Sequence, residues 1–162
     1  MIRTVPLVFL LAACSSGTQD RAEEHIADYE SAVAAAQALT TDHVATVAAA
    51  TTMEEVPTLE ATYVSDWDTM HADMTAAMDM LEKCDMDDEG MGIMDEADTS
   101  MADAEAAVMD HMSGHDTHAD LAACVTDEDA HAVTMTEHLD AMMAHGDEWR
   151  GNTHCDEKMG GM

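Results

Sequence analysis

Apolar residues recur at helical spacing along most of the chain, in four long stretches separated by short breaks. The stretches cover residues 20–52, 57–84, 96–124 and 126–149, and in each the apolar positions repeat every three or four residues. This is the period of an amphipathic helix, and no segment shows the strict alternation typical of a strand. Because the breaks are short, consecutive helices are expected to run antiparallel. The pattern predicts an all-α fold, an up-down-up-down antiparallel four-helix bundle.

Local signals indicate where these helices begin and end. Pro57 suits the first turn of the second helix, where a missing N–H costs nothing. Two glycines among acidic residues predict a loop over residues 85–95, and the run 126–129 resembles an N-terminal cap for the fourth helix. Gly114, inside the third stretch, is expected to kink that helix. No internal sequence repeat is evident.

Composition limits what the core of such a bundle can contain. Of the 162 residues 47% are apolar, yet only 3% are aromatic and 17 are Met. Few Leu, Ile and Val follow residue 14, a composition often found in disordered chains. Ala, Met and Glu are strong helix formers, however, and they favour helices here. The core is therefore expected to consist of Ala, Met and a less usual residue type.

The charge excludes several classes of function. Thirty-five Asp and Glu against 5 Lys and Arg give a formal net charge of −30. Such a surface repels nucleic acid and concentrates cations. No nucleophile triad, phosphate-binding loop or paired-carboxylate site is evident, so an enzyme is not expected. We assign no catalytic residue and no organic cofactor, and the sequence indicates no particular protein partner.

The N-terminus has the pattern of a secretion signal. A short basic start precedes an apolar run that is too short to span a bilayer. The run ends in Leu11-Ala12-Ala13-Cys14, which resembles the lipobox of bacterial lipoproteins. The resemblance implies that Cys14 is lipidated, and that the chain crosses the inner membrane and is anchored, facing the periplasm, in the outer membrane. The expected organisation is a signal peptide (1–13), a lipidated Cys with a tether (14–19), the bundle (20–150) and a flexible Met/Cys/His tail (151–162).

Histidine and methionine occupy inward positions that aliphatic residues usually fill. In the fourth helix they recur at alternating steps of four and three residues, which keeps them on one narrow face. A buried imidazole needs hydrogen-bonding partners that this core hardly offers, and a metal ion can replace them. The candidate ligands are His43, His71, His111, His115, His118, His131, Met135, His138, Met142 and His145.

Depth along the bundle selects a central site from this set. Counted from the end where the first helix passes to the second and the third to the fourth, four candidates fall in one layer. They are His43, His115, Met135 and His138.

The opposite end of the bundle is rich in sulfur. Its candidate soft-metal ligands are Cys84, Met91, Met94, Cys155, Met159 and Met162. Thiolate and thioether donors select Cu(I). A structural disulfide between Cys84 and Cys155 is the alternative, since disulfides are common in secreted proteins.

Three functions remain open. The His and Met pattern loosely resembles the Met/His-rich periplasmic copper-binding proteins, which implies sequestration or buffering of copper as Cu(I) or Cu(II). Zinc, iron, nickel and silver are the alternative ions. A second possibility is an acidic structural or interaction lipoprotein that holds no metal. The third is a ferritin-like or hemerythrin-like iron-binding bundle, for which Glu128 and His131 supply only one Glu-x-x-His unit.

Overall fold

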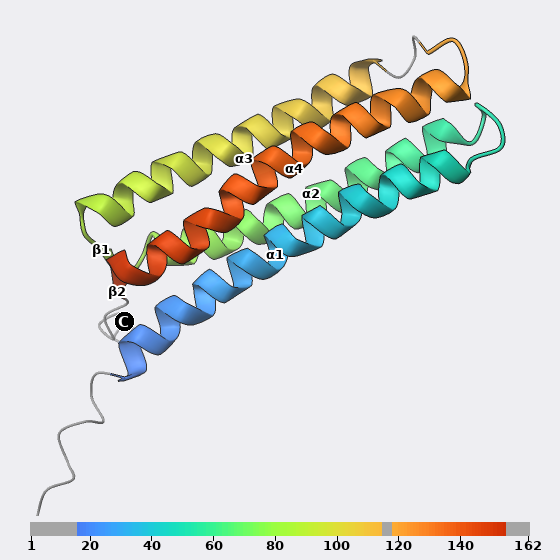
Figure 1. Cartoon of the computed structure of the whole chain (residues 1–162). Coiled ribbons are helices and arrows are strands. Elements are labelled where there is room, and N and C mark those ends of the chain that lie inside the picture. The colour runs from blue at the N-terminus through green and yellow to red at the C-terminus, as the bar shows by residue number, and fades with distance from the viewer. Residues whose placement is uncertain (1–15, 115–117, 155–162) are drawn as a thin grey trace, which may run out of the picture.

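The computed structural model describes residues 16–114 and 118–154, and it consists almost entirely of four long helices. Neighbours in sequence run in opposite directions along a common axis (Figure 1), which confirms the predicted all-α, up-down-up-down bundle. No helix in these ranges combines the length and the hydropathy needed to cross a membrane. The helices are α1 (Ser16–Ala49), α2 (Val56–Leu81), α3 (Asp88–Gly114) and α4 (Leu121–Asn152).

The start of α2 is as predicted, whereas the predicted loop over residues 85–95 is wrong. Pro57 occupies the first turn of α2. After the two-residue strand β1 (Asp85–Met86), α3 begins at once, and the Asp87 carboxylate accepts a hydrogen bond from the backbone N–H of Gly90 at 2.8 Å. Gly90 is required there, because a Cβ would lie 2.7 Å from the backbone oxygen of Asn152. Acidic residues in the first turn also stabilise this helix end.

The predicted boundary between the third and fourth helices is wrong by several residues. Gly114 ends α3 instead of kinking it, and α4 begins at Leu121. Asp120 is the N-cap, since its side chain accepts a hydrogen bond from the backbone N–H of Ala123 at 3.0 Å. The acidic run 126–129 therefore lies inside α4. This change shifts the depth of every residue counted from that turn.

The core combines the Met and Ala that the composition predicts with a few aromatic residues and with branched aliphatic residues such as Val33, Leu81 and Leu139. Met74, Met135 and Met142 are completely buried. Tyr29 and Trp149 pack edge to face with ring centroids 5.0 Å apart, which joins α1 to α4. The helix α1 packs closely on α2 and α4, and α3 packs on α4, whereas the contact between α2 and α3 is looser.

The two halves of the bundle are related by an offset of 68 residues. Adding 68 to the number of a buried residue in α1 or α2 gives a buried residue in α3 or α4 at nearly every position. The strand β1 likewise corresponds to β2 (Thr153–His154), and the two pair antiparallel. Residue types differ at most matched positions, such as Trp67 and Met135, so the repeat is hidden in the sequence. The bundle thus consists of two equivalent helical hairpins.

Gly146 supports the close contact between α4 and α1 and gives a first prediction. A Cβ at this position would lie 2.7 Å from Cγ of Glu30, whose carboxylate pairs with the Arg150 guanidinium at 2.6 Å. We expect Gly146→Ala to lower the free energy of unfolding by about 1–3 kcal/mol, because the Glu30 side chain must move. Urea denaturation measures the change.

The matched control is Gly92→Ala in α3, where nothing lies within 4 Å of an added Cβ. That substitution should stabilise the helix by up to about 1 kcal/mol. Equal stability gains in both variants would show that the contact at Gly146 is unimportant.

Candidate metal centre

One side chain from each of the four helices meets in the core of the bundle. His43 of α1, Glu60 of α2, His111 of α3 and Glu128 of α4 each offer a ligand atom, and these atoms all lie within 4.8 Å of one another. The four residues are between 0% and 8% exposed. Charged groups are rarely buried this completely unless they are paired or bind a metal. These four buried groups must therefore pair with one another or bind a metal ion.

The two carboxylates and the two imidazoles form a closed ring. His43 Nε2 lies 3.2 Å from Glu60 Oε1 and 3.3 Å from Glu128 Oε2. His111 Nε2 lies 3.1 Å from Glu128 Oε1 and 3.7 Å from Glu60 Oε2. Each carboxylate thus presents one oxygen to each imidazole.

This ring has the same twofold relation as the fold. The offset of 68 converts His43 into His111 and Glu60 into Glu128, and in each hairpin the Glu follows the His by 17 residues. Each hairpin therefore contributes the same pair, a His from its first helix and a Glu from its second.

A second pair of equivalent residues packs against the imidazoles. Tyr63 stacks on His43 with centroids 4.2 Å apart, and His131 stacks on His111 at 4.0 Å. Tyr63 and His131 are themselves related by the offset of 68, and the Tyr63 hydroxyl is hydrogen-bonded to His131 Nε2 at 3.0 Å. These rings hold both ligand imidazoles in fixed orientations.

The carboxylates determine the protonation of the histidines. Burial alone would lower the pKa of His43, but the adjoining carboxylates of Glu128 and Glu60 outweigh it and raise that pKa to about 9. Burial alone would also lower the pKa of His111, but the adjoining carboxylate of Glu128 outweighs this effect and raises that pKa. Glu128 has a strongly lowered pKa because the two imidazoles overcome its burial. In the metal-free centre the carboxylates therefore favour the imidazolium forms of both histidines.

His131 behaves in the opposite way. Its burial and the positive charge of His111 lower its pKa to about 4. It is therefore a neutral ring at physiological pH, suited to stacking and to its hydrogen bond with Tyr63.

Among the residues that the structure describes, a carboxylate contacts the outer nitrogen of His111. His111 Nδ1 lies 3.1 Å from Oδ2 of Asp127, and the same oxygen lies 3.3 Å from His118 Nε2. Histidines that bind metals commonly donate their second N–H to a carboxylate, which fixes the tautomer. Asp127 holds His111 in this manner, with Nε2 directed to the centre.

The spacing of the donor atoms suits a single small ion. Zn–N and Zn–O bonds of about 2.1 Å in a tetrahedron place the ligand atoms about 3.4 Å apart. The His–Glu contacts given above, 3.1 to 3.7 Å, are close to this value and use both oxygens of each Glu, and one donor atom from each of the four residues lies within 4.8 Å of the other three. This buried His/Glu group can hold a metal ion.

Of the predicted central site, the described part of the chain places His43 alone in this cluster. Met135 is a completely buried core residue and His138 is half-buried beside a separate surface hollow. His115 lies outside the described residues. The predicted turn is misplaced: α3 ends at Gly114 and α4 begins at Leu121, and His111 lies at the depth of His43.

Other predicted ligands are dispersed. The rings of His71 and Trp67 have centroids 6.3 Å apart, and Met142 belongs to the apolar core. His118 lies outside the cluster, where its Nε2 contacts the Asp127 carboxylate that also contacts His111. His145 forms a second, more open group with Glu96 and Glu148, whose carboxylates are exposed.

Sequence reasoning missed Glu60 and considered Glu128 only with His131, as the Glu-x-x-His unit of an iron-binding bundle. Glu60 lies three positions before Tyr63, as Glu128 lies three before His131, and both are buried on the inward faces. The signal that identifies them is the 17-residue spacing from His to Glu, which occurs in both hairpins.

At the sulfur-rich end, Cys84 is disulfide-bonded and is therefore not a thiolate ligand. Met91 and Met94 line a hollow beside it. The other predicted members, Cys155, Met159 and Met162, lie outside the described residues, as does Cys14. Cys124 is buried, with its Sγ 4.0 Å from Sδ of Met53.

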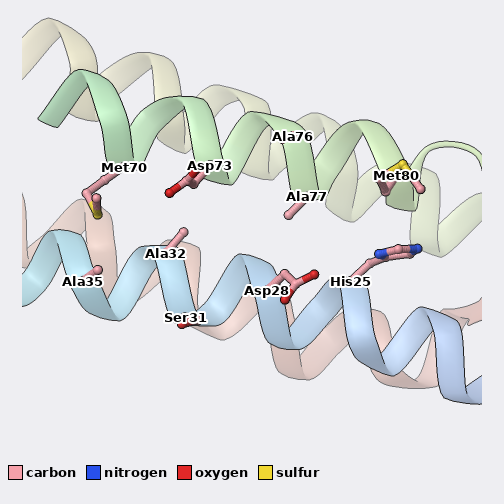
Figure 2. A pocket seen from close by; sticks show the side chains of 10 residues that line it. All are labelled: His25, Asp28, Ser31, Ala32, Ala35, Met70, Asp73, Ala76, Ala77 and Met80. Carbon is pink, nitrogen blue, oxygen red and sulfur yellow. The ribbon is translucent and has the colours of Figure 1, made fainter. Parts of the chain in front are cut away.

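A surface hollow between α1 and α2 is shown in Figure 2. It has a volume of about 540 Å³ and is lined by small residues, with His25 beside Met80 near one end and Met70 at the other. Its Asp28 and Asp73 do not join His25 in a group within ligand distance. The hollow therefore does not resemble the buried cluster.

No protein family, curated protein or solved structure matches this chain.

Proposed function

We propose that this protein binds one divalent metal ion in its core through His43, Glu60, His111 and Glu128. The observation that carries the proposal is the convergence of four buried donor groups, one from each helix, at separations suited to a tetrahedral site. The stacked rings of Tyr63 and His131 and the carboxylate of Asp127 support it, because they orient the imidazoles.

The charge of the centre favours a divalent ion. Two imidazolium ions and two carboxylates sum to zero. Replacing the two Nε2 protons with one M²⁺ keeps the sum at zero, whereas a monovalent ion would leave −1 and a trivalent ion +1 in a buried site. An uncompensated buried charge is costly. This balance argues against Cu(I) and Ag(I).

The donor types favour the same group of ions. The cluster offers nitrogen and oxygen but no sulfur, a set that suits Zn²⁺, Cu²⁺, Ni²⁺ or Fe²⁺. The near-tetrahedral spacing favours Zn²⁺ among them. The copper expected from the sequence is thereby restricted to Cu(II) in this centre.

The proposed role is sequestration or buffering of this ion at the cell envelope. The lipobox-like sequence that ends in Cys14 supports secretion and lipid anchoring. The net charge of −30 supports local enrichment of cations around the protein.

The direct test is titration of residues 15–162 with Zn²⁺, Cu²⁺, Fe²⁺ and Cu(I), followed by calorimetry and native mass spectrometry. We expect one divalent ion per chain with a Kd below about 1 μM, and weaker binding of Cu(I). If no ion binds more tightly than this and helicity is unchanged in chelator, the alternative of a structural lipoprotein without metal is favoured.

An iron-binding bundle remains a second candidate because each Glu divides its two oxygens between the two histidines. A carboxylate that bridges two iron ions uses its oxygens in the same way. Two Fe²⁺ ions carry four positive charges, and the loss of the two Nε2 protons offsets only two of them. Two bridging hydroxide ions would therefore have to accompany the two iron ions. Binding of two irons per chain and a new absorption band after aerobic Fe²⁺ addition would favour this candidate.

A further inference from the structure

The inner ligands of the metal centre are symmetric, but the residues that separate them from solvent are not. On the C-terminal hairpin a hollow of about 260 Å³ opens between α3 and α4. It is lined by His111 and His131 at its inner side and by Asp110, Asp127 and Thr134. A ligand of the buried centre therefore forms part of the wall of a surface hollow.

The equivalent surface of the N-terminal hairpin carries larger apolar residues. Subtracting 68 replaces Ala107 of the hollow with Leu39, and Asp127 with Leu59. Both leucines are half-buried and pack against the apolar clusters of the bundle. Leu39 and Leu59 thus cover the side of the centre next to His43. The equivalent residues Ala107 and Asp127 leave the side next to His111 open.

From this difference we infer that a hydrated divalent cation reaches the buried centre through the α3–α4 hollow, with Asp127 and Asp110 as its first ligands and His111 as the first inner ligand. The inference rests on the proposed function. Oxygen ligands on the rim can replace part of the hydration shell before the ion reaches nitrogen donors. Asp127 is suited to this step because its side chain is 39% exposed and it contacts His111.

A competing path is less suitable for a hydrated cation. A second hollow, of about 440 Å³ between α2 and α3, reaches Glu60. Its other lining residues are largely apolar and include Met53, Val56 and Met112. An ion that lost water there would find few oxygen atoms in exchange, and this loss is costly.

The test is Ala107→Leu, which gives the α3–α4 surface the residue that already covers the equivalent site on α1. Zn²⁺ binding is followed by stopped-flow competition with a chromogenic chelator, and release by the same chelator in excess. We expect association and dissociation to slow together by about tenfold or more, because the ion then needs a local opening of the bundle. The Kd should stay within about threefold, since the inner ligands are unchanged.

The control is Ala102→Leu, the same substitution at an exposed position on α3. It should leave both rates unchanged. The reciprocal variant, Leu59→Asp, removes an apolar residue that covers the His43 side of the centre, so association and dissociation should both be faster. This variant tests the path even if Ala107→Leu does not fold.

Unchanged rates in both Ala107→Leu and Leu59→Asp would overturn the inferred path, as would a rise in Kd caused by faster release from Ala107→Leu. Failure of the wild-type protein to bind any divalent ion is a different result, which contradicts the proposed function itself.

Discussion

Replacing Glu128 with Gln is expected to abolish tight metal binding and to destabilise the metal-free bundle. Glu128 is completely buried, and its oxygens lie 3.1 Å from His111 Nε2 and 3.3 Å from His43 Nε2. The amide keeps the shape but removes the charge, so two imidazolium ions would face one remaining carboxylate. Breaking a buried ion pair in this way costs about 3–5 kcal/mol. Metal affinity should fall by at least about a hundredfold, more than is typical of losing an outer-shell partner.

The two effects are measured separately. Urea denaturation in chelator gives the stability of the metal-free protein, and competition titration with Zn²⁺ gives the affinity. The matched control is Glu137→Gln, which removes the same charge from an exposed position of α4. A Zn²⁺ affinity that is the same in both variants would exclude the four-helix cluster as the metal centre.

The helical architecture could be predicted because the spacing of apolar residues is a local property. The turn between α3 and α4 could not be placed in the same way. Asp120 and the acidic run 126–129 offer equally good caps by sequence, and Gly114 is compatible with a kink or an end. The choice depends on tertiary register, because His111 lies opposite His43 only when α3 ends near Gly114 and α4 begins near Leu121. That long-range contact has no local signal.

The candidate site was predicted in part for a related reason. His43 and His111 are unusual in an apolar face, so they are conspicuous in the sequence. Glu60 and Glu128 are two of 35 acidic residues, and the others whose burial the structure describes are exposed or half-buried, so composition does not reveal these two as buried. Only the comparison of the two hairpins, in which each His precedes a Glu by 17 residues, distinguishes them. The methionines Met135 and Met142, also predicted as ligands, are completely buried among the apolar side chains of the core.

The stability of the metal-free protein is expected to fall as the pH rises from about 6.5 to 9. The pKa of His43 is raised from 6.5 to about 9 in the folded state, so its contribution is complete below pH 6.5 and is lost as the pH passes the folded value. This shift corresponds to about 3 kcal/mol. The raised pKa of His111 acts in the same direction. Urea denaturation in chelator across this pH range measures the slope.

Metal affinity should have the opposite pH dependence over the same range. His43 and His111 must each lose the Nε2 proton before they can bind an ion, so protons compete with metal. The apparent affinity for Zn²⁺ should therefore rise by up to about a hundredfold per pH unit while both sites are protonated, because two protons leave for each ion. In Glu128→Gln the fall in metal-free stability with pH should be smaller, since His43 and His111 lose the carboxylate they share. If stability in chelator is constant from pH 6.5 to 9 in the wild-type protein, the histidines are not held as imidazolium ions, and the exchange of two protons for one divalent ion is wrong.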